Sequence, residues 1–344
     1  MGILSAFYHT ILLGRHGLYR YGIKAVRHLP RPVISVGNLT LGGTGKTPAV
    51  MAIAMEAVKR GIRPLILTRG YRGKAKGPCF VSKGHGPIIG SEEAGDEAYL
   101  MAGLLKDVSV VKGKDRYKAG IFALDELDTL TANRKSQIPD LFILDDGFQH
   151  WQLWRDVNIL LIDYHRPFGN GRLFPEGQLR EPLEAIERAD VIVITKAEDL
   201  QQDKIAEIKE AIQRYNQRAP IFIETHMPVC LVKEGAELSL EAIKGERILA
   251  FAGIAEPESF KYLLTSIGGD VVRFKSYTDH HPYSKGDIGY IRQNAVDSGA
   301  RWIITTEKDM ARLKGMGVDA DFTALRIGFS IDRGFYDLVF KCCG

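Results

Sequence analysis

Three glycines followed by Lys-Thr form the segment of this sequence with the clearest chemical meaning. Residues 33–50 contain an apolar stretch, then the glycines, then Lys46-Thr47. Glycine has no Cβ, so the backbone N–H groups of such a loop can approach a polyphosphate closely. The ammonium of Lys46 would then face the β- and γ-phosphates, and the hydroxyl of Thr47 would face Mg²⁺. The segment therefore predicts a nucleotide-binding loop between a strand and a helix.

The predicted loop departs from the usual pattern at its first position. Its members are Thr40, Leu41, Gly42, Gly43, Thr44, Gly45, Lys46 and Thr47. Thr40 stands where the pattern G-x-x-x-x-G-K-[ST] begins with glycine. Pro48 suits the first turn of the following helix, where its missing N–H costs little. A glycine-rich turn without a ligand is the alternative interpretation, so further signals are needed.

A pair of acids supplies one such signal. Residues 141–144 are apolar and follow the breaker Pro139, and Asp145 and Asp146 come next. A nucleotide-binding loop of this kind works with a metal-binding carboxylate at the end of a buried strand. One acid of the pair is expected to reach Mg²⁺, directly or through water, and the other to orient a catalytic group. The residue types leave open which acid does which, and a strand ending at a solvated pair is the structural alternative.

A further carboxylate lies near the start of a predicted helix. Residues 91–99 place Glu92 and Glu93 in its first turn, where negative charge suits the helix dipole. Asp96 comes later, directly after Gly95, which leaves room for a substrate close to the backbone. Asp96 is therefore a candidate base for a hydroxyl proton.

Two arginines and a histidine complete the candidate residues. Arg116 and Arg172 follow predicted strands, which places them at the sheet edge where ligands bind and makes them candidates for phosphate or transition-state charge. His280 follows Asp279 in a polar, aromatic loop. An imidazole there could tune a carboxylate such as Asp96 across a cleft. Solvated surface positions are the alternative for all three.

Composition excludes several classes of protein. The chain has 344 residues with a formal charge of +4, which does not by itself indicate a nucleic-acid partner. The four cysteines lack metal-ligand spacing, and the adjacent Cys342 and Cys343 are poorly placed for an internal disulfide, which favours a reducing cytoplasm. No apolar run approaches the roughly 18–20 residues of a membrane span. We expect no signal peptide, because no cleavage site of small residues follows an apolar core.

The first residues nevertheless have a pattern suited to a membrane surface. Leu4, Phe7 and Ile11 follow helical spacing, and the first 55 residues contain no acid. An apolar stripe with flanking cations allows a helix to lie on an anionic bilayer. The alternative is an ordinary helix that packs on the core.

Short apolar stretches alternate with helical patterns along the chain. This alternation predicts an α/β fold, P-loop NTPase-like, with a mostly parallel sheet covered by helices and a second, smaller α/β domain. The predicted division is an N-terminal amphipathic helix in residues 1–28, a P-loop domain in residues 29–228 and a C-terminal domain in residues 229–344.

These motifs together resemble the tetraacyldisaccharide 4'-kinases of lipid A biosynthesis. The matching stretches are residues 37–48, 68–71, 95–97, 114–116, 145–150, 169–172, 179–182, 195–196, 279–280 and 306–309. They occur in family order over most of the chain, so the resemblance is far more specific than any single motif.

The resemblance implies transfer of the ATP γ-phosphoryl group to the 4'-hydroxyl of a tetraacyldisaccharide 1-phosphate. It further implies Mg²⁺ and a peripheral or monotopic place at the cytoplasmic face of the bacterial inner membrane, with neither nucleic acid nor an obligate protein partner. Carried over by position, Asp96 is the base and His280 its partner from the second domain, while Lys46 and Arg116 neutralise charge. The family's N-terminal helix is associated with membrane and lipid. We expect the two domains to close over the substrates. The roles of residues 307–309 are not assigned.

A P-loop switch GTPase or a metallochaperone is the alternative from another class. Lys46, Asp145 and the order Thr195-Lys196-x-x-Asp199 favour it, because this order resembles a base-reading loop. Thr195 occupies the place where that loop usually has Asn, and the sequence contains no Cys/His metal cluster. This alternative predicts a preference for GTP and turnover without lipid.

Overall fold

The structure is a computed structural model that describes residues 2–129, 138–197, 201–318 and 320–343. The chain forms two compact units. Unit 1 contains Met1–His226 and Phe329–Gly344, and unit 2 contains Met227–Gly328.

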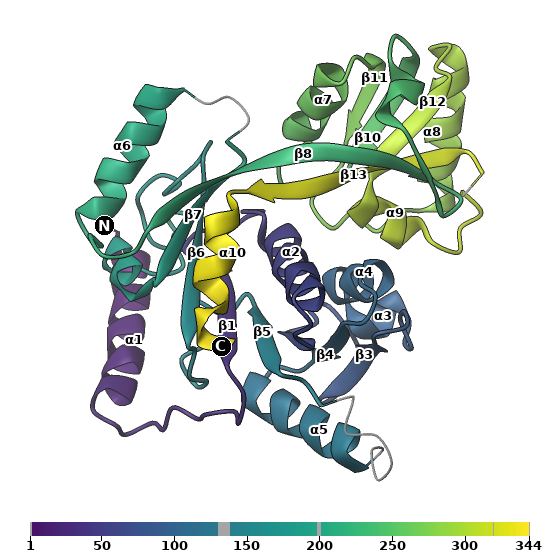
Figure 1. The fold of residues 1–344 in the computed structure, drawn as a ribbon. Coiled ribbons are helices and arrows are strands. Elements are labelled where there is room, and N and C mark those ends of the chain that lie inside the picture. Colours follow the sequence, from purple (N-terminus) through teal and green to yellow (C-terminus); the bar gives the residue numbers. More distant parts are fainter. Residues whose placement is uncertain (1, 130–137, 198–200, 319, 344) are drawn as a thin grey trace. The chain divides into compact units, whose positions relative to one another are not determined.

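Unit 1 is built on a mostly parallel sheet (Figure 1). Its strands are β1 (Val33–Asn38), β2 (Pro64–Thr68), β3 (Cys79–Lys83), β4 (Ser109–Lys112), β5 (Leu141–Asp145), β6 (Val157–Asp163), β7 (Val191–Thr195) and β8 (Ile221–Lys233), of which β8 continues into unit 2. The strand order is β8-β7-β6-β1-β5-β2-β4-β3, and only β3 is antiparallel to its neighbour. This confirms the predicted α/β fold. The carboxyl ends of the parallel strands meet at one edge, where such sheets bind ligands.

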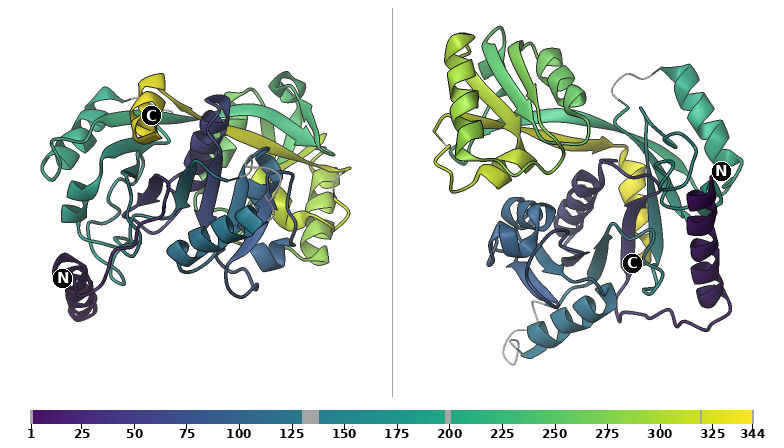
Figure 2. Two further views of the ribbon diagram at one scale, coloured as in Figure 1. Left: turned by 60° about the horizontal axis from the view of Figure 1, so that its bottom comes forward. Right: turned by 180° about the vertical axis from the view of Figure 1, so that it is seen from behind.

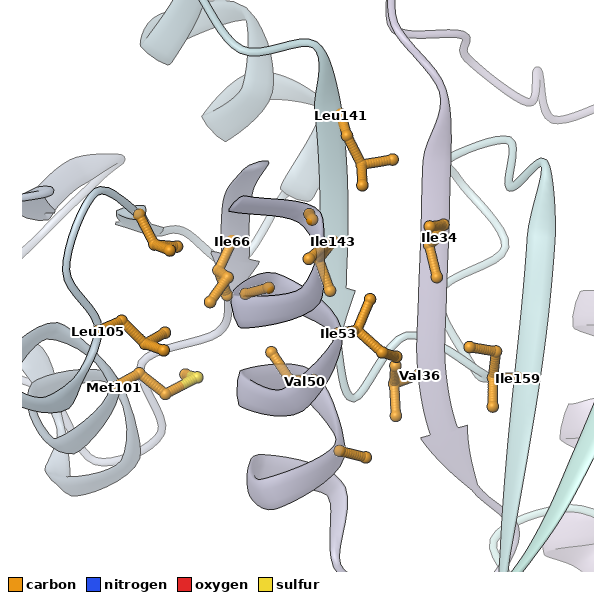
Figure 3. Close-up of a cluster of buried hydrophobic side chains, with 14 of the residues drawn as sticks. Ile34, Val36, Val50, Ile53, Ile66, Met101, Leu105, Leu141, Ile143 and Ile159 are labelled. Atoms are coloured by element: carbon orange, nitrogen blue, oxygen red, sulfur yellow. The ribbon is translucent and has the colours of Figure 1, made fainter. Parts of the chain in front are cut away.

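Helices cover both faces of this sheet. They are α1 (Ile3–Arg20), α2 (Lys46–Lys59), α3 (Ser91–Ala94), α4 (Asp96–Leu104), α5 (Arg116–Thr129), α6 (Gln202–Gln213) and α10 (Arg333–Val339), with the short 3₁₀ helices η2 (Leu183–Arg188) and η4 (Phe340–Cys343). Alternate strand residues face opposite sides. In β5, Ile143 packs with α2 and α4, whereas Phe142 and Leu144 pack with α5. Figure 3 shows the first of these clusters, in which Ile53 and Val50 of α2 lie among strand and α4 side chains. This packing fixes α2, and with it the loop before it.

The last residues differ from the predicted division. Residues 329–344 were expected in the C-terminal domain, but they belong to unit 1, as the yellow C-terminal helix in Figures 1 and 2 shows. The reason is hydrophobic burial, because Phe335 and Val339 of α10 are fully buried in the core beside β1 and α2.

Unit 2 has a smaller parallel sheet in the order β11-β10-β12-β13. Its strands are β9 (Ala236–Leu238), which pairs with β8, and β10 (Arg247–Ala252), β11 (Asp270–Ser276), β12 (Trp302–Thr306) and β13 (Phe322–Ile331). Its helices are the 3₁₀ helix η3 (Leu240–Ile243), α7 (Pro257–Ser266), α8 (Lys285–Asp297) and α9 (Glu307–Leu313). Two apolar clusters, one on each face of this sheet, hold it together.

The N-terminal helix α1 packs on unit 1 by one face and exposes the other. Tyr8 and Leu12 contact the apolar cluster beside β6 and β7. Phe7 and Ile11 are 67% and 52% exposed. Within the described residues, no helix is long and apolar enough to cross a membrane. The helix therefore packs on the core by one face, as one alternative predicts, and has exposed apolar side chains on the other.

Candidate active site

The predicted nucleotide loop joins the end of β1 to the start of α2. Its backbone has positive φ at Gly42 (φ +121°) and Gly45 (φ +80°), a conformation that side chains other than glycine rarely adopt. Lys46 is the first residue of α2, so the loop's amides and the positive end of the helix dipole lie together. The Thr195 hydroxyl donates to the Thr44 carbonyl oxygen at 3.1 Å, which ties the loop to the end of β7.

Lys46 is held in place by two groups beside the loop. Its Nζ donates to Asn38 Oδ1 at 3.1 Å and lies 3.7 Å from Asp146 Oδ1. Burial lowers the pKa of Lys46, although the attraction of Asp146 opposes that shift. The Asn38 amide also donates to the Thr40 carbonyl oxygen at 2.7 Å, so it supports both ends of the loop.

The two acids after β5 have different environments. Asp145 is buried and accepts a hydrogen bond from the Thr68 hydroxyl at 2.7 Å. Burial, together with repulsion from Glu97 and Asp146, raises the pKa of Asp145 to about 6. Asp146 has φ +51° and lies beside Lys46. Burial tends to raise the pKa of Asp146, but Lys46 and Arg180 outweigh it and leave that pKa below its usual value.

Arg180 is the second cation that contacts Asp146, besides Lys46. Its Nη1 donates to both carboxylate oxygens of Asp146, at 2.9 and 3.0 Å. The backbone around Arg180 also pairs with the start of the loop, because Leu41 N donates to the Gln178 carbonyl oxygen and Arg180 N donates to that of Leu39, both at 2.7 Å. The segment that carries Arg180 therefore supports the loop and the acid pair together.

Arg116, the first residue of α5, is almost fully buried beside the acids. Its Nη1 donates to the Lys114 carbonyl oxygen at 3.0 Å, and its Nη2 lies 3.5 Å from that of Asp145. Its buried Nε has no hydrogen-bond partner among the described residues. Burial lowers the pKa of Arg116, an effect that Asp145 and Asp146 oppose. A guanidinium with an unused donor suits an anionic ligand.

Asp96, half-buried, is the first residue of α4 and follows Gly95. Gly95 has φ +89°, and a Cβ there would lie 2.4 Å from the Tyr71 carbonyl oxygen, so only glycine fits. Glu97, the next residue, contributes to the raised pKa of Asp145. The start of α4 is thus on the same side of unit 1 as the acid pair.

His280 belongs to unit 2, where it lies between β11 and α8. Its Nδ1 lies 3.1 Å from Arg312 Nη2, and its Nε2 lies 3.9 Å from Asp279 Oδ1. The structure therefore brings Lys46, Arg116 and the acid pair together in unit 1, and it describes His280 with its own surroundings in unit 2.

Several residues of the site escaped sequence reasoning. Asn38, Thr68 and Arg180 contact predicted site residues, and only the family resemblance contains a signal for them. Arg172, a sequence candidate, is exposed. In the resemblance to a base-reading loop, Lys196 is described and pairs with Asp163 at 2.7 Å, whereas Asp199 lies outside the described residues.

Comparisons with known proteins show which family this chain is similar to. The model of the LpxK family, Tetraacyldisaccharide-1-P 4'-kinase, matches residues 1–341. A Tetraacyldisaccharide 4'-kinase of Syntrophus aciditrophicus is 38% identical, covering 98% of this chain and 91% of the relative. One of Geobacter sulfurreducens is 40% identical, covering 91% and 83%.

A solved relative extends the match to the three-dimensional structure. LpxK from Aquifex aeolicus, described in complex with ATP, is 35% identical with a TM-score of 0.77, covering 99% of this chain and 98% of its own. These findings confirm the predicted lipid kinase with ATP as its nucleotide, and they give no support to the GTPase or metallochaperone alternative. The match of the family model to nearly the whole sequence shows that this chain belongs to the tetraacyldisaccharide-1-P 4'-kinase family.

Proposed function

We propose that this kinase works with Asp96 as the base, Lys46 and Arg116 as the charge-neutralising groups, and His280 as the partner of the base. In the reaction the 4'-hydroxyl oxygen of the disaccharide attacks the γ-phosphorus of ATP. A new O–P bond forms, the bond to the β-phosphate oxygen breaks, and the hydroxyl proton passes to the base. The observation that carries the proposal is the cluster of Lys46, Asp145, Asp146 and Arg116. This cluster lies beside a loop whose glycines adopt positive φ.

Charge neutralisation and alignment are the larger part of phosphoryl transfer. Lys46 would bind the β- and γ-phosphate oxygens together with the amides of residues 40–47. Arg116, with its buried and unused Nε, would face the charge on the transferred group. Because both side chains are buried, their electrostatic effect is stronger than it would be in water.

The acid pair fits a magnesium ion. Asp145, Asp146 and the Thr47 hydroxyl offer the hard oxygen ligands that Mg²⁺ prefers, and such sites take one or two carboxylates and complete the shell with phosphates and water. Burial first, and repulsion from Glu97 and Asp146 second, raise the pKa of Asp145, so a bound cation would favour its ionised form. No cluster of three or more His, Cys, Asp or Glu side chains suited to a metal occurs in the described part of the chain. When bound, the ion would neutralise phosphate charge.

Asp96 supports the role of base by its position. It lies at the start of α4, and its neighbour Glu97 contributes to the raised pKa of Asp145 in the acid pair. Gly95 does not leave room for a substrate as the sequence suggested, because the Tyr71 carbonyl oxygen fills the space beside it. His280 is assigned to the same reaction because it matches the family motif. An imidazole that donates to the Asp96 carboxylate would hold it toward the hydroxyl.

The exposed face of α1 supports attachment to the membrane that contains the lipid substrate. Ile3, Leu4, Phe7 and Ile11 are all exposed on one helix. Its other face is fixed to unit 1, where the Tyr8 hydroxyl donates to the Arg180 carbonyl oxygen at 2.8 Å and the Ser5 hydroxyl to that of Leu173 at 2.9 Å. An apolar stripe on a docked helix suits a peripheral or monotopic protein at the cytoplasmic face of the inner membrane.

The test is transfer of labelled γ-phosphoryl from ATP to tetraacyldisaccharide 1-phosphate in mixed micelles. We expect Asp96→Asn to lower kcat by about 10²–10⁴-fold with an unchanged Kd for ATP, since a positioned base contributes that much. Lys46→Met should lower kcat and also weaken the binding of ATP. Glu92→Gln, an exposed acid on the neighbouring helix α3, is the matched control. Wild-type kcat in Asp96→Asn would overturn the assignment of the base.

A further inference from the structure

We propose that Arg312 is a positioning residue that holds His280 in the tautomer with its proton on Nε2. The inference rests on the proposed partnership of His280 with Asp96. It also gives a role to Asp309, one of the three residues whose function the sequence left open.

The contact between the two side chains determines where the proton lies. Arg312 Nη2 is 3.1 Å from His280 Nδ1. A guanidinium is always charged in proteins and has donors only. Nδ1 must therefore accept this hydrogen bond, and a neutral imidazole that accepts at Nδ1 has its proton on Nε2. The other tautomer, or the imidazolium, would turn an N–H toward the guanidinium.

Arg312 is itself tightly fixed. Its side chain is 6% exposed, and its Nη1 donates at 2.8 Å both to Asp309 Oδ1 and to the Gly253 carbonyl oxygen. Asp309 is fully buried and accepts two further hydrogen bonds at Oδ2, from Gly253 N at 3.0 Å and from the Thr306 hydroxyl at 2.8 Å. Thr306, Asp309 and Gly253 thus form a hydrogen-bonded socket that fixes the orientation of the guanidinium.

The backbone of His280 is fixed by the same socket. His280 N donates to the Gly253 carbonyl oxygen at 3.2 Å, the oxygen that also accepts from Arg312. His280 has φ +59°, an uncommon conformation for a residue with a side chain. Such conformations persist where the surroundings impose them, and they gather at functional sites. A Cβ on Gly253 would lie 3.0 Å from Asp309 Oδ1, so glycine keeps this junction compact.

The fixed tautomer matches the chemistry of the proposed partner. With Nδ1 engaged, Nε2 presents an N–H, which can donate to a carboxylate. That donation would hold one oxygen of Asp96 and leave the other to take the hydroxyl proton. The opposite tautomer would present a lone pair to the carboxylate and repel it.

Nitrogen-15 NMR tests the tautomer directly, without an activity assay. In full-length protein labelled with ¹⁵N-histidine, at about pH 8 where imidazole is neutral, long-range ¹H–¹⁵N correlations distinguish a protonated from an unprotonated ring nitrogen. His280→Gln identifies the signal. We expect Nε2 protonated in the wild type and a mixture of tautomers in Arg312→Gln. Nδ1 protonated in the wild type would overturn the inference.

Kinetics separate this inference from the proposed function. Arg312→Gln should lower kcat at least about tenfold, which is a fraction of the roughly 10²–10⁴-fold that general acid–base groups contribute. The KM for ATP should stay within about twofold. Guanidine should restore part of kcat in Arg312→Ala. Arg292→Gln removes an arginine whose salt bridge to Asp321 is partly exposed, and it should behave as wild type. Lost activity in His280→Gln but not in Arg312→Gln overturns this inference alone. Wild-type kcat in His280→Gln removes the proposed role of His280, and the inference with it.

Discussion

Asp145 shows how a functional carboxylate can destabilise the protein that carries it. An aspartate in water has a pKa near 3.9, whereas burial beside Glu97 and Asp146 raises the pKa of Asp145 to about 6. Folding therefore favours the protonated form. The ionised form that a cation needs is held in place by the Thr68 hydrogen bond and by the surrounding packing.

The sign of this shift gives a prediction for stability against pH. Because the pKa is raised in the folded state, the favourable contribution is complete below about pH 4 and is lost as pH rises through about 6. In the ligand-free protein we expect Asp145→Asn to be more stable than wild type at pH 8 by up to about 2–3 kcal/mol, and equal below pH 4. Chemical denaturation at several pH values measures this.

A second aspartate provides a control of opposite sign. The Arg63 guanidinium lowers the pKa of the largely exposed Asp140. Asp140→Asn should therefore cost stability above about pH 4, by no more than about 1 kcal/mol, since exposed pairs contribute little. A loss of stability in Asp145→Asn at pH 8 would contradict the account. Asp145→Asn should also have lost kinase activity, because it removes a proposed ligand of Mg²⁺.

Arg180 gives a prediction for catalysis that the sequence alone did not suggest. Arg180→Met removes two hydrogen bonds to Asp146, leaving that carboxylate to Lys46 at 3.7 Å. Hydrogen bonds to charged groups contribute roughly 1.5–3 kcal/mol, so we expect kcat/KM for ATP to fall about 10–100-fold. The exposed Arg172 provides the control, and Arg172→Met should leave this ratio within about threefold. A larger loss of kcat/KM in Arg172→Met than in Arg180→Met would contradict the role given to Arg180.

At the scale of elements, α1 packs on unit 1 by one face and has exposed apolar side chains on the other, which we propose to contact the membrane. Replacing Phe7 and Ile11 by serine removes exposed apolar area without touching the docked side of the helix. Each large apolar side chain contributes about 1.5–3 kcal/mol when buried, so the double variant should bind anionic vesicles at least 10²-fold more weakly in flotation assays. Its free energy of unfolding should change by less than about 0.5 kcal/mol per site. Val296→Ser, at an exposed apolar position on α8, should leave vesicle binding unchanged.

Local chemistry and long-range pairing differ in how far sequence predicts them. Lys46 and the glycines before it could be identified because they are neighbours in the sequence and form one continuous loop. Arg180 was not, because it meets Asp146 across 34 residues, and the charge pattern between them indicates no particular partner. The same holds for α10, whose apolar residues could have packed on either core. The strands have local apolar runs, and their alternation with helical patterns was enough to predict the α/β fold for this reason.

At the scale of the whole molecule, the proposed chemistry requires residues of both units. Asp96 belongs to unit 1 and His280 to unit 2, and the chain passes between the units twice, after His226 and after Gly328. For a reaction that uses both side chains at one hydroxyl, we predict that the units close over the substrates. Closure would also exclude water, which otherwise competes with the sugar for the phosphoryl group.

Small-angle scattering tests this closure. With a non-hydrolysable ATP analogue, Mg²⁺ and a water-soluble disaccharide acceptor, we expect the radius of gyration to fall below that of the ligand-free protein, and to fall less with nucleotide alone. Lys46→Met is the control, because a site without the ammonium should hold the triphosphate weakly and close less. An unchanged scattering profile with all ligands bound, confirmed by calorimetry, would mean that the units do not move. His280 would then have to be tested as a partner of Asp96 within a preformed site, by a double-mutant cycle on kcat.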